Sequence, residues 1–310
     1  MRRARPMSLR PAPEPGATHR AGRVALVGRP NVGKSTLLNR LVGARISITS
    51  RRPQTTRARV TGIVTRPDAQ IELVDTPGFQ TQHRSALNRA MNRGVSAGLQ
   101  GVDAVVWLVE ALQYDERDAV VARLLQESGP VILAISKADT VRDKARLLPF
   151  IARLAELRSF EAIIPISAEK GWQLEELLDA IVRLLPEGPP LHDADDMTTV
   201  NERFLAAELL REKLFRLLGE ELPYASGVEI DRFTQEGELR TIHASIVVDK
   251  EGQKPIVIGK GGKQLKTIAS QARRDMERLF GGKVFLEVWV KVKRGWTGNA
   301  AALRRMGFND

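Results

Sequence analysis

GRPNVGKST, residues 28–36, has the pattern G-x-x-x-x-G-K-[ST] and follows the apolar run RVALVG, residues 23–28. The apolar spacing after it predicts a helix over 34–42. In this setting the two glycines let the backbone bend around phosphate groups without a side chain in the way. Successive amides and the start of the helix then supply donors and a positive dipole end. The stretch therefore predicts a phosphate-binding loop between a strand and a helix.

Short apolar runs alternate with helix-like stretches throughout residues 24–185. Runs rich in Val and Ile predict buried strands at 23–28, 70–76, 104–110, 131–136 and 162–167. Helices are predicted at 34–42, 84–98, 115–128, 142–158 and 172–185. This alternation indicates an α/β fold with a doubly wound, mostly parallel sheet covered on both faces. Binding loops of such a sheet lie at the carboxyl ends of its strands.

The phosphate loop supplies a lysine and a hydroxyl at its end. We expect Lys34 to reach the β- and γ-phosphates of a nucleotide and Ser35 to ligate Mg²⁺. The alternative is a glycine turn that binds no ligand, in which case Lys34 would stand at this place of the motif only by chance. The predicted nucleotide contacts of the loop are Gly28, Arg29, Pro30, Asn31, Val32, Gly33, Lys34, Ser35 and Thr36.

A second motif, DTPG at 75–78, ends the next predicted strand. We expect Asp75 to hold Mg²⁺ through water and the amide of Gly78 to contact the γ-phosphate. The intervening RPQTTRARV, residues 52–60, offers Thr56 to close the Mg²⁺ shell, with Thr55 as the alternative. Both threonines could instead be ordinary loop hydroxyls. The predicted contacts of the second motif are Asp75, Thr76, Pro77, Gly78 and Phe79.

SKAD, residues 136–139, follows a further strand and is similar to the guanine-recognition motif Asn-Lys-x-Asp. Asp139 can accept hydrogen bonds from N1 and the N2 amino group of guanine, a pairing that adenine would leave unmade. Lys137 can pack its stem along the base. Ser136 stands where the motif has Asn, so we expect weaker binding with the guanine preference kept. The amide of Ala168, in SAEK at 167–170, is expected to reach guanine O6. The predicted contacts of these two loops are Ser136, Lys137, Ala138, Asp139, Ser167, Ala168 and Glu169.

The last third of the chain has a different order of elements. PEGPPLHDADD, residues 186–196, reads as a linker because Pro, Gly and Asp punctuate it. The pattern then predicts a helix at 201–218, strands at 227–233 and 239–249, two helices within 255–280 and a strand at 283–292. We expect the helix at 201–218 and Trp289 to serve packing rather than partner binding or base stacking.

A glycine turn, GKGG at 259–262, separates the two helices within 255–280. A G-x-x-G by itself is usually just a turn, but KH domains use it to clamp the backbone of RNA. Residues 250–310 carry 14 Lys and Arg against 5 Asp and Glu, which suits an RNA-binding face. The predicted RNA contacts are Lys254, Gly259, Lys260, Gly261, Gly262, Lys263 and Lys266.

Taken together, the motifs resemble those of one family of translation-factor-type GTPases, the Era family. The resemblance rests on GRPNVGKSTLLNRLVG, RRPQTTR, DTPGF, SAEKG, REKLFRLLGEELPYASGVEIDRF and IVIGKGGKQLKTI, and it covers about residues 22–305. It implies a GTPase domain at 22–185, a linker at 186–200 and a type II KH domain at 201–300. A basic tail at 1–21 and a C-terminal tail at 301–310 complete the expected organisation.

The resemblance also implies a function. Era proteins are ribosome-assembly GTPases, so we expect GTP and GDP binding with Mg²⁺, slow GTP hydrolysis and binding near the 3′ end of small-subunit ribosomal RNA. Phe79 stands where many GTPases have the Gln that orients water, and in related GTPases an Asn at the place of Asn31 helps bind K⁺. We therefore expect Lys34, Thr56, Gly78 and Asn31 to carry catalysis and switching, with K⁺ raising turnover. Peripheral contact with the bacterial inner membrane is implied as well.

Composition limits the alternatives. The chain has no cysteine, which excludes disulfides and cysteine-based zinc sites and favours a reducing cytoplasm. No apolar run reaches the length of a membrane-spanning helix. The Arg- and Pro-rich residues 1–23 read as a disordered tail rather than a mitochondrial transit peptide, and Met7 is an alternative start. We expect a monomer.

Two other functions fit parts of the sequence. One is an RNA-binding chaperone whose GTPase domain is weakened by Ser136 and is largely structural. The other is an ATP-using phosphate-loop protein, which Asp139 disfavours.

Overall fold

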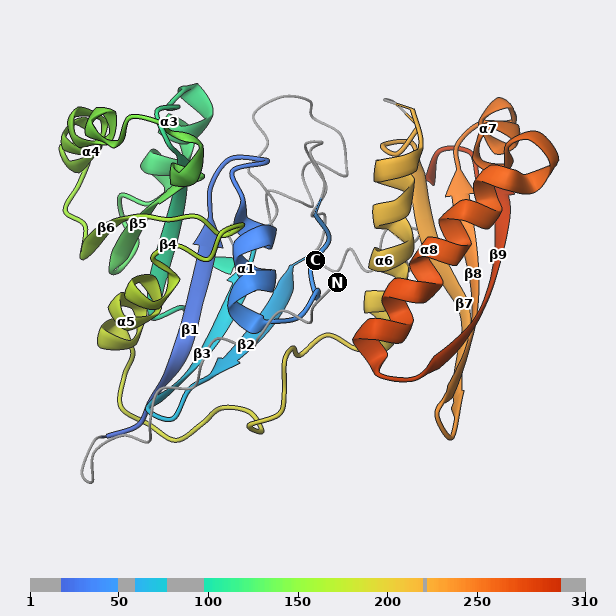
Figure 1. Cartoon of the computed structure of the whole chain (residues 1–310), viewed down its shortest axis with the longest axis horizontal. Helices are drawn as coiled ribbons and strands as arrows, with labels where there is room; N and C mark the ends of the chain where they lie inside the picture. Colours follow the sequence, from blue (N-terminus) through green and yellow to red (C-terminus); the bar gives the residue numbers. More distant parts are fainter. Residues whose placement is uncertain (1–17, 50–58, 77–97, 220–221, 297–310) are drawn as a thin grey trace. The chain divides into compact units, whose positions relative to one another are not determined.

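The computed structural model describes residues 18–49, 59–76, 98–219 and 222–296. The chain divides into two compact units (Figure 1). Residues 200–310 belong to the second unit together with the short segments 48–58 and 84–90, and the rest of the chain belongs to the first. The first unit contains the phosphate loop, and the second contains the GKGG turn.

A six-stranded sheet forms the centre of the first unit, in the order β2-β3-β1-β4-β5-β6. Its strands are β1 Arg20–Val27, β2 Val60–Thr65, β3 Ala69–Asp75, β4 Ala104–Glu110, β5 Val131–Ser136 and β6 Ala162–Pro165. All neighbouring pairs are parallel except β2 and β3, which are antiparallel. The doubly wound, mostly parallel sheet predicted from the alternation of strands and helices is confirmed.

Helices bury both faces of this sheet. They are α1 Lys34–Val42, α3 Glu116–Leu124, α4 Leu147–Ala155 and α5 Leu174–Leu184. On β1, Ala25 and Val27 join the core formed with α3 and α4, while Val24 and Leu26, on the other face, are equally buried. The predicted helices at 115–128, 142–158 and 172–185 are therefore present but shorter. The one at 84–98 lies almost wholly outside the described residues.

Strand β2 is not predicted by the apolar pattern of the sequence. Val60, Ile63 and Val64 are buried, yet Gly62 and two threonines interrupt the apolar pattern. Gly62 is required because a Cβ there would lie 2.7 Å from Leu38 Cδ1 and 2.9 Å from Ile46 Cδ1. The glycine thus lets the sheet edge approach α1 and the segment after it.

The segment predicted as a linker lies against the first unit. The amide of Gly188 donates to the carbonyl of His19 at 3.0 Å, and the amide of Ile63 donates to the carbonyl of Met197 at 2.9 Å. Gln70, fully buried, accepts from the amide of Leu191 at 2.7 Å and from that of His192 at 2.8 Å. Residues 186–198 are thereby bound along the sheet of the first unit, including its edge strand β2.

The second unit is a three-stranded sheet with helices packed on it. Its elements, in chain order, are α6 Glu202–Leu217, β7 Ser226–Glu236, β8 Leu239–Val248, α7 Lys254–Ile258, α8 Lys263–Phe280 and β9 Lys283–Val292. The strand order is β7-β8-β9, with β7 and β8 antiparallel and β8 and β9 parallel. Leu209, Ile246 and Met276 belong to its common core, which confirms that α6 serves packing.

Trp289 packs against a neighbouring ring, on a face of the sheet that is partly exposed. Its neighbours on β9, Val288 and Val290, pack on the core, whereas Trp289 is 41% exposed and stacks on His243, with ring centroids 5.6 Å apart. Alternation along β9 assigns Trp289 to the face opposite the helices. The sequence pattern shows this alternation but does not reveal which of the two faces is covered.

We predict that Gly62→Ala destabilises the first unit by about 1–3 kcal/mol, because the added methyl group overpacks a closed contact with α1. Thermal or urea unfolding of the purified protein measures the change. Gly129→Ala is the matched control, since a Cβ at Gly129 meets nothing within 4 Å. Equal stability of the two variants would contradict this account of Gly62.

Candidate functional site

The phosphate loop lies between β1 and α1 and depends on glycine at both ends. Gly28 has φ 150° and Gly33 has φ 114°, backbone angles that residues other than glycine rarely adopt. A Cβ at Gly28 would also lie 2.6 Å from the carbonyl oxygen of Leu108. Asn31 is left-handed as well, with φ 64°. The loop is thus a tight turn at the carboxyl end of the central strand, as its glycines predict.

Lys34 bends back into this loop. Its ammonium donates to the carbonyls of Gly28 at 2.8 Å and Arg29 at 2.9 Å, and the residue is 5% exposed. Burial lowers the pKa of Lys34 to about 8, although Asp75 and Asp118 oppose the shift. A cation held inside a backbone loop is suited to an anionic ligand.

Asp75 meets the start of α1 from the end of β3. Its Oδ2 accepts from the hydroxyls of Ser35 at 2.6 Å and Ser47 at 2.9 Å. Asp75 is fully buried, its Oδ1 has no hydrogen-bond partner within the described residues, and burial raises its pKa. A buried carboxylate with an unpaired oxygen is costly, and a divalent cation with oxygen ligands would satisfy it. Asp75 and Ser35 therefore fit a magnesium site.

Ser47 also belongs to this site, although no sequence motif predicts it. It contacts Asp75 from the segment after α1, in a stretch with no recognisable motif. The hydroxyl of Thr76, a predicted contact, donates instead to the carbonyl of Leu26 at 2.8 Å, which ties β3 to β1. The remaining predicted residues Thr56, Pro77, Gly78 and Phe79 lie outside the described part of the chain.

Ser136 makes a direct contact with the phosphate loop. Its hydroxyl donates to the carbonyl of Val32 at 2.7 Å, and both residues are buried. Serine at this position therefore braces the loop without a bridging water.

The rest of SKAD forms a short turn after β5. Lys137 is left-handed with φ 56°, and Asp139 is exposed in the turn Ala138–Thr140. The amide of Ala138 donates to the carbonyl of Ile166 at 3.0 Å, which joins this turn to the loop containing Ala168 and Glu169. Ser167 holds that loop by accepting from the amide of Lys170 at 3.0 Å. The two predicted guanine loops are thus neighbours at one sheet edge.

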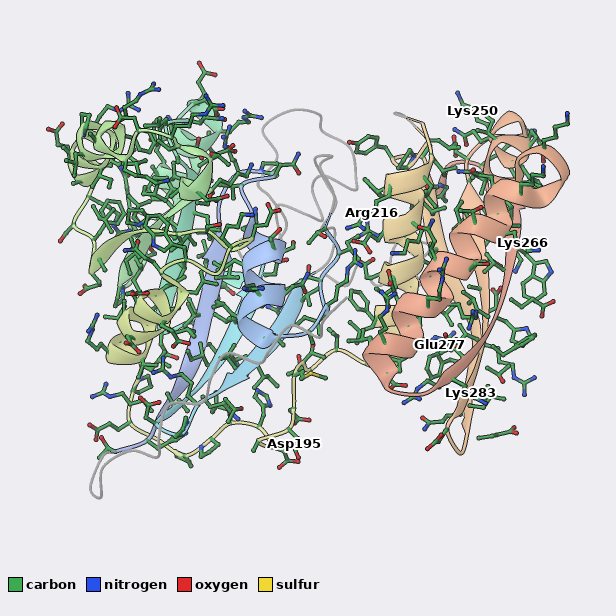
Figure 2. All side chains as sticks on the ribbon, viewed as in Figure 1. Asp195, Arg216, Lys250, Lys266, Glu277 and Lys283 are labelled. Atoms are coloured by element: carbon green, nitrogen blue, oxygen red, sulfur yellow. The ribbon has the colours of Figure 1, made fainter. Side chains whose placement is uncertain are left out.

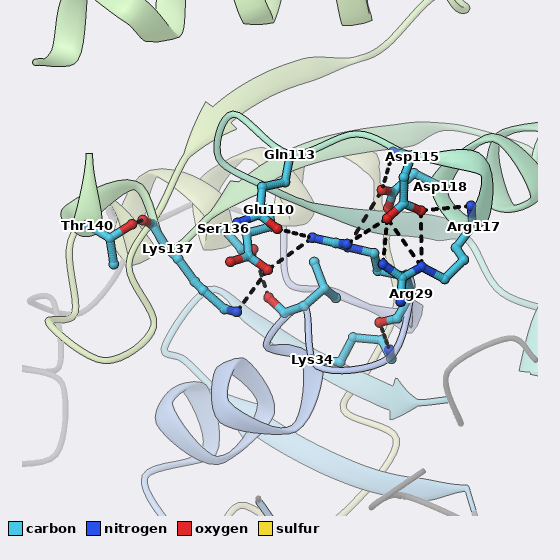
Figure 3. A network of polar contacts seen from close by, with 11 residues as sticks. Arg29, Lys34, Glu110, Gln113, Asp115, Arg117, Asp118, Ser136, Lys137 and Thr140 are labelled. Atoms are coloured by element: carbon cyan, nitrogen blue, oxygen red, sulfur yellow. Dashed lines mark hydrogen bonds and ion pairs between the residues drawn. The ribbon is translucent and has the colours of Figure 1, made fainter. Parts of the chain in front are cut away.

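Arg29 belongs to a network that the sequence did not reveal (Figure 3). Its guanidinium, 7% exposed, donates to Glu110 at 3.1 Å, Gln113 at 2.9 Å and Asp115 at 3.0 Å. Asp115 caps α3 in a capping box with Asp118, so the acidic start of that helix faces the loop. The side chain of Arg29 is therefore engaged by protein carboxylates.

Asp118 is a further buried member of this network. Its Oδ2 lies 3.6 Å from Arg29 Nε, and the residue has no solvent exposure. Burial raises the pKa of Asp118 to about 6. The carboxyl group is thus costly to ionise despite the nearby guanidinium.

In the second unit, the GKGG turn separates α7 from α8. Gly259, Gly261 and Gly262 have φ values of 72°, 59° and 76°. A Cβ at Gly259 would lie 2.6 Å from Gln264 Cβ, so glycine is required at that place. Lysines lie in and near the turn: Lys260, Lys263 and Lys266 are exposed, and Lys254 is partly buried. Figure 2 labels Lys266 on α8. The tight turn and its charges are arranged as a backbone clamp needs.

Comparison with known proteins assigns the family. The family model "50S ribosome-binding GTPase" matches residues 23–137, and the model "KH domain" matches residues 212–297. The chain is 53% identical to GTPase Era of Stenotrophomonas maltophilia, over 94% of this chain and 98% of that relative. It belongs to the GTPase Era family. GTPase Era of Nitrosomonas eutropha is also 53% identical, with the same coverage.

Two solved structures of Era resemble this family member over nearly its whole length. One is an Aquifex aeolicus Era variant bound to GDP and AlF4⁻, with a TM-score of 0.90 and 38% identity, covering 93% of this chain and 99% of that one. The other is Era in complex with MgGDPNP and nucleotides 1506–1542 of 16S ribosomal RNA. Its TM-score is 0.90 and its identity 37%, covering 94% of this chain and 99% of that one. A GTPase fold followed by a KH domain is confirmed.

We predict that Ser136→Ala lowers the affinity for GDP about tenfold. The buried carbonyl of Val32 then loses its hydrogen-bond donor, and the phosphate loop is no longer held by residue 136. Calorimetric titration measures the change. Ser128→Ala is a matched control, since the Ser128 hydroxyl donates to the carbonyl of Leu125 at 2.7 Å, before β5 begins. The same dissociation constant in wild type and Ser136→Ala would show that this hydrogen bond does not support binding.

Proposed function

We propose that this member of the Era family binds GTP with Mg²⁺, hydrolyses it slowly and binds small-subunit ribosomal RNA near its 3′ end during assembly of the small ribosomal subunit. The observation that carries the nucleotide half is the buried Lys34 ammonium inside the phosphate loop. The ribosomal RNA in the related Era complex supports the other half.

Ser35 and Asp75 are the residues we propose to hold Mg²⁺, with Thr56 closing the shell when the γ-phosphate is present. The unpaired Asp75 Oδ1 supports this assignment. The metal would neutralise charge on the phosphates, while Lys34 and the loop amides orient them. The MgGDPNP of the related Era complex agrees with the donor set.

Guanine selectivity rests on Asp139 and on the backbone amide of Ala168 in the adjoining loop. The exposed carboxylate of Asp139 is accessible to a base, and only guanine offers it two donors. Ser136 braces the phosphate loop, which favours a working nucleotide site over the alternative of a purely structural GTPase domain.

Hydrolysis needs a water in line with the γ-phosphate and neutralised charge. Phe79 cannot orient that water, so we propose that K⁺ assists, with Asn31 among its ligands. The place of Asn31 within the phosphate loop supports this role.

The proposed organisation is a GTPase domain at 22–185, a linker at 186–200 and a KH domain at 201–300, with tails at 1–21 and 301–310. We further propose that the γ-phosphate orders residues 51–59 and 75–84, most of which lie outside the described part of the chain, and that this state controls presentation of the KH face to RNA.

A cytoplasmic monomer with peripheral inner-membrane contact completes the proposal for location and assembly. Within the described residues, no helix combines the length and apolar character needed to span a bilayer. The bacterial relatives support a bacterial rather than a mitochondrial setting.

We predict that the purified protein binds GDP and GTP with micromolar dissociation constants and does not bind ATP, measured by calorimetry at fixed Mg²⁺. Phosphate release should be slow and faster in KCl than in NaCl. Failure to bind either guanine nucleotide would reject the GTPase function and leave an RNA-binding chaperone. Equal rates in the two salts would reject only the role of K⁺.

We predict that Lys260→Ala weakens binding to a single-stranded RNA with the 3′ sequence of small-subunit ribosomal RNA about three- to tenfold. The slope of log K against log salt should fall by about one, because one phosphate contact is lost. Fluorescence anisotropy over a salt series measures both. Lys283→Ala, an exposed lysine at the start of β9, is the control (Figure 2). Equal losses in both variants would point to diffuse charge rather than the GKGG turn.

A further inference from the structure

One carboxylate oxygen joins the two loops of the nucleotide site. Oε2 of Glu110 accepts from Arg29 Nη2 at 3.1 Å and lies 2.9 Å from Lys137 Nζ (Figure 3). Arg29 comes from the phosphate loop and Lys137 from the guanine loop. Glu110 ends β4 directly beside Ser136, its register partner on β5, so the sheet itself sets its position between them.

We propose that Glu110 is a positioning residue that fixes Lys137 against the phosphate loop and thereby determines the affinity for guanine nucleotides. This inference rests on the proposed function and deepens it. None of the four predicted nucleotide motifs contains Glu110, and its role follows only from the bridge between Arg29 and Lys137.

An ion pair that fixes the Lys137 side chain would help it bind a base, for two reasons. A lysine side chain is long and flexible, and it loses rotamer freedom when it lies along a base. Its backbone is also left-handed, with φ 56°, a conformation that must be held by the surroundings. An ion pair formed before the nucleotide arrives holds the ammonium in place, so less freedom is lost on binding.

Arg29 makes the anchor rigid. Its side chain is 7% exposed and is also held by Gln113 and Asp115, so the guanidinium cannot move freely with Glu110. Glu110 is 18% exposed and Arg29 is 7% exposed, so water screens the ion pair between them little. The Lys137 side chain is 39% exposed, and its ion pair with Glu110 is screened more. Within the described residues, Glu110 alone of these Arg29 partners also pairs with Lys137.

Ser136 supplies the second connection between the same loops, through its hydrogen bond to Val32. The two connections lie on adjacent residues of the guanine loop, 136 and 137, and reach two different residues of the phosphate loop. The shorter serine side chain is thus supplemented by an ionic bridge next to it.

The test is a double-mutant cycle on GDP affinity, measured by calorimetry with the full chain. Glu110→Gln keeps the shape and an acceptor but removes the charge. Lys137→Met keeps the apolar stem and removes the ammonium. We expect Glu110→Gln to raise the dissociation constant about tenfold in the wild-type background and less than twofold in the Lys137→Met background.

Asp115→Asn is the matched control, because Asp115 also holds Arg29 but does not pair with Lys137. Because Asp115 does not contact Lys137, any effect of its substitution on the dissociation constant should be the same in both backgrounds. If Glu110→Gln does not fold, as judged by circular dichroism, Glu110→Asp enters the same cycle, since it keeps the charge on a side chain too short to span both cations.

The outcomes distinguish the positioning role of Glu110 from the GTPase function. Equal effects of the Glu110 substitution in both backgrounds would overturn the positioning role while leaving the GTPase function intact. No GDP binding by the wild type would reject the proposed function itself, and the positioning role with it.

Discussion

The parallel pairing of β1 with both β3 and β4 is the constraint on which the nucleotide site depends. It brings the carboxyl ends of these strands to one edge, where the phosphate loop follows β1 and where Asp75 and Glu110 are the last residues of β3 and β4. Because β5 continues the parallel sheet, Ser136 arrives at the same edge. The chemistry of the site is therefore contributed by loops, but its geometry is set by backbone hydrogen bonds between strands.

The edge of the sheet concentrates buried charge, and burial is what makes these groups responsive to ligands. Lys34 and Asp75 are both removed from water, which destabilises their charged forms. A bound phosphate with a divalent cation would supply the compensating charges, so binding energy and site stability are coupled. Arg29 differs, because carboxylates of the protein already surround it. The buried lysine and aspartate thus lack compensating charge until a ligand binds, whereas the side chain of Arg29 is already paired within the protein.

In the second unit, a glycine turn again places charged groups where a phosphate group can approach the backbone, here in RNA. Gly259 allows the backbone of α8 to follow closely on α7, and the exposed Lys260 and Lys263 extend from the turn. The apolar faces of α6, α8 and the sheet are buried in a common core, whereas the ammonium groups of Lys260 and Lys263 remain accessible. Positive φ at the glycines and positive charge at the lysines act together, since close approach strengthens contacts to phosphate.

The sequence by itself determined the chemistry of the ligands. The glycine spacing, Lys34, Ser35, Asp75, Asp139 and the GKGG turn each identify a local conformation or donor set, because motifs of this kind depend on neighbouring residues. It also determined the parallel sheet and the order of elements in the second unit, since both follow from short-range periodicity.

Only the tertiary structure decided which distant residues complete the site. Ser136 and Val32 are 104 positions apart, and Arg29 and Glu110 are 81 apart, so no local pattern connects them. Ser47 and strand β2 were missed for the same reason, and the sequence did not show which face of its sheet carries Trp289. Their roles depend on which side chain or sheet edge lies opposite in space, and the packing of the whole unit determines that.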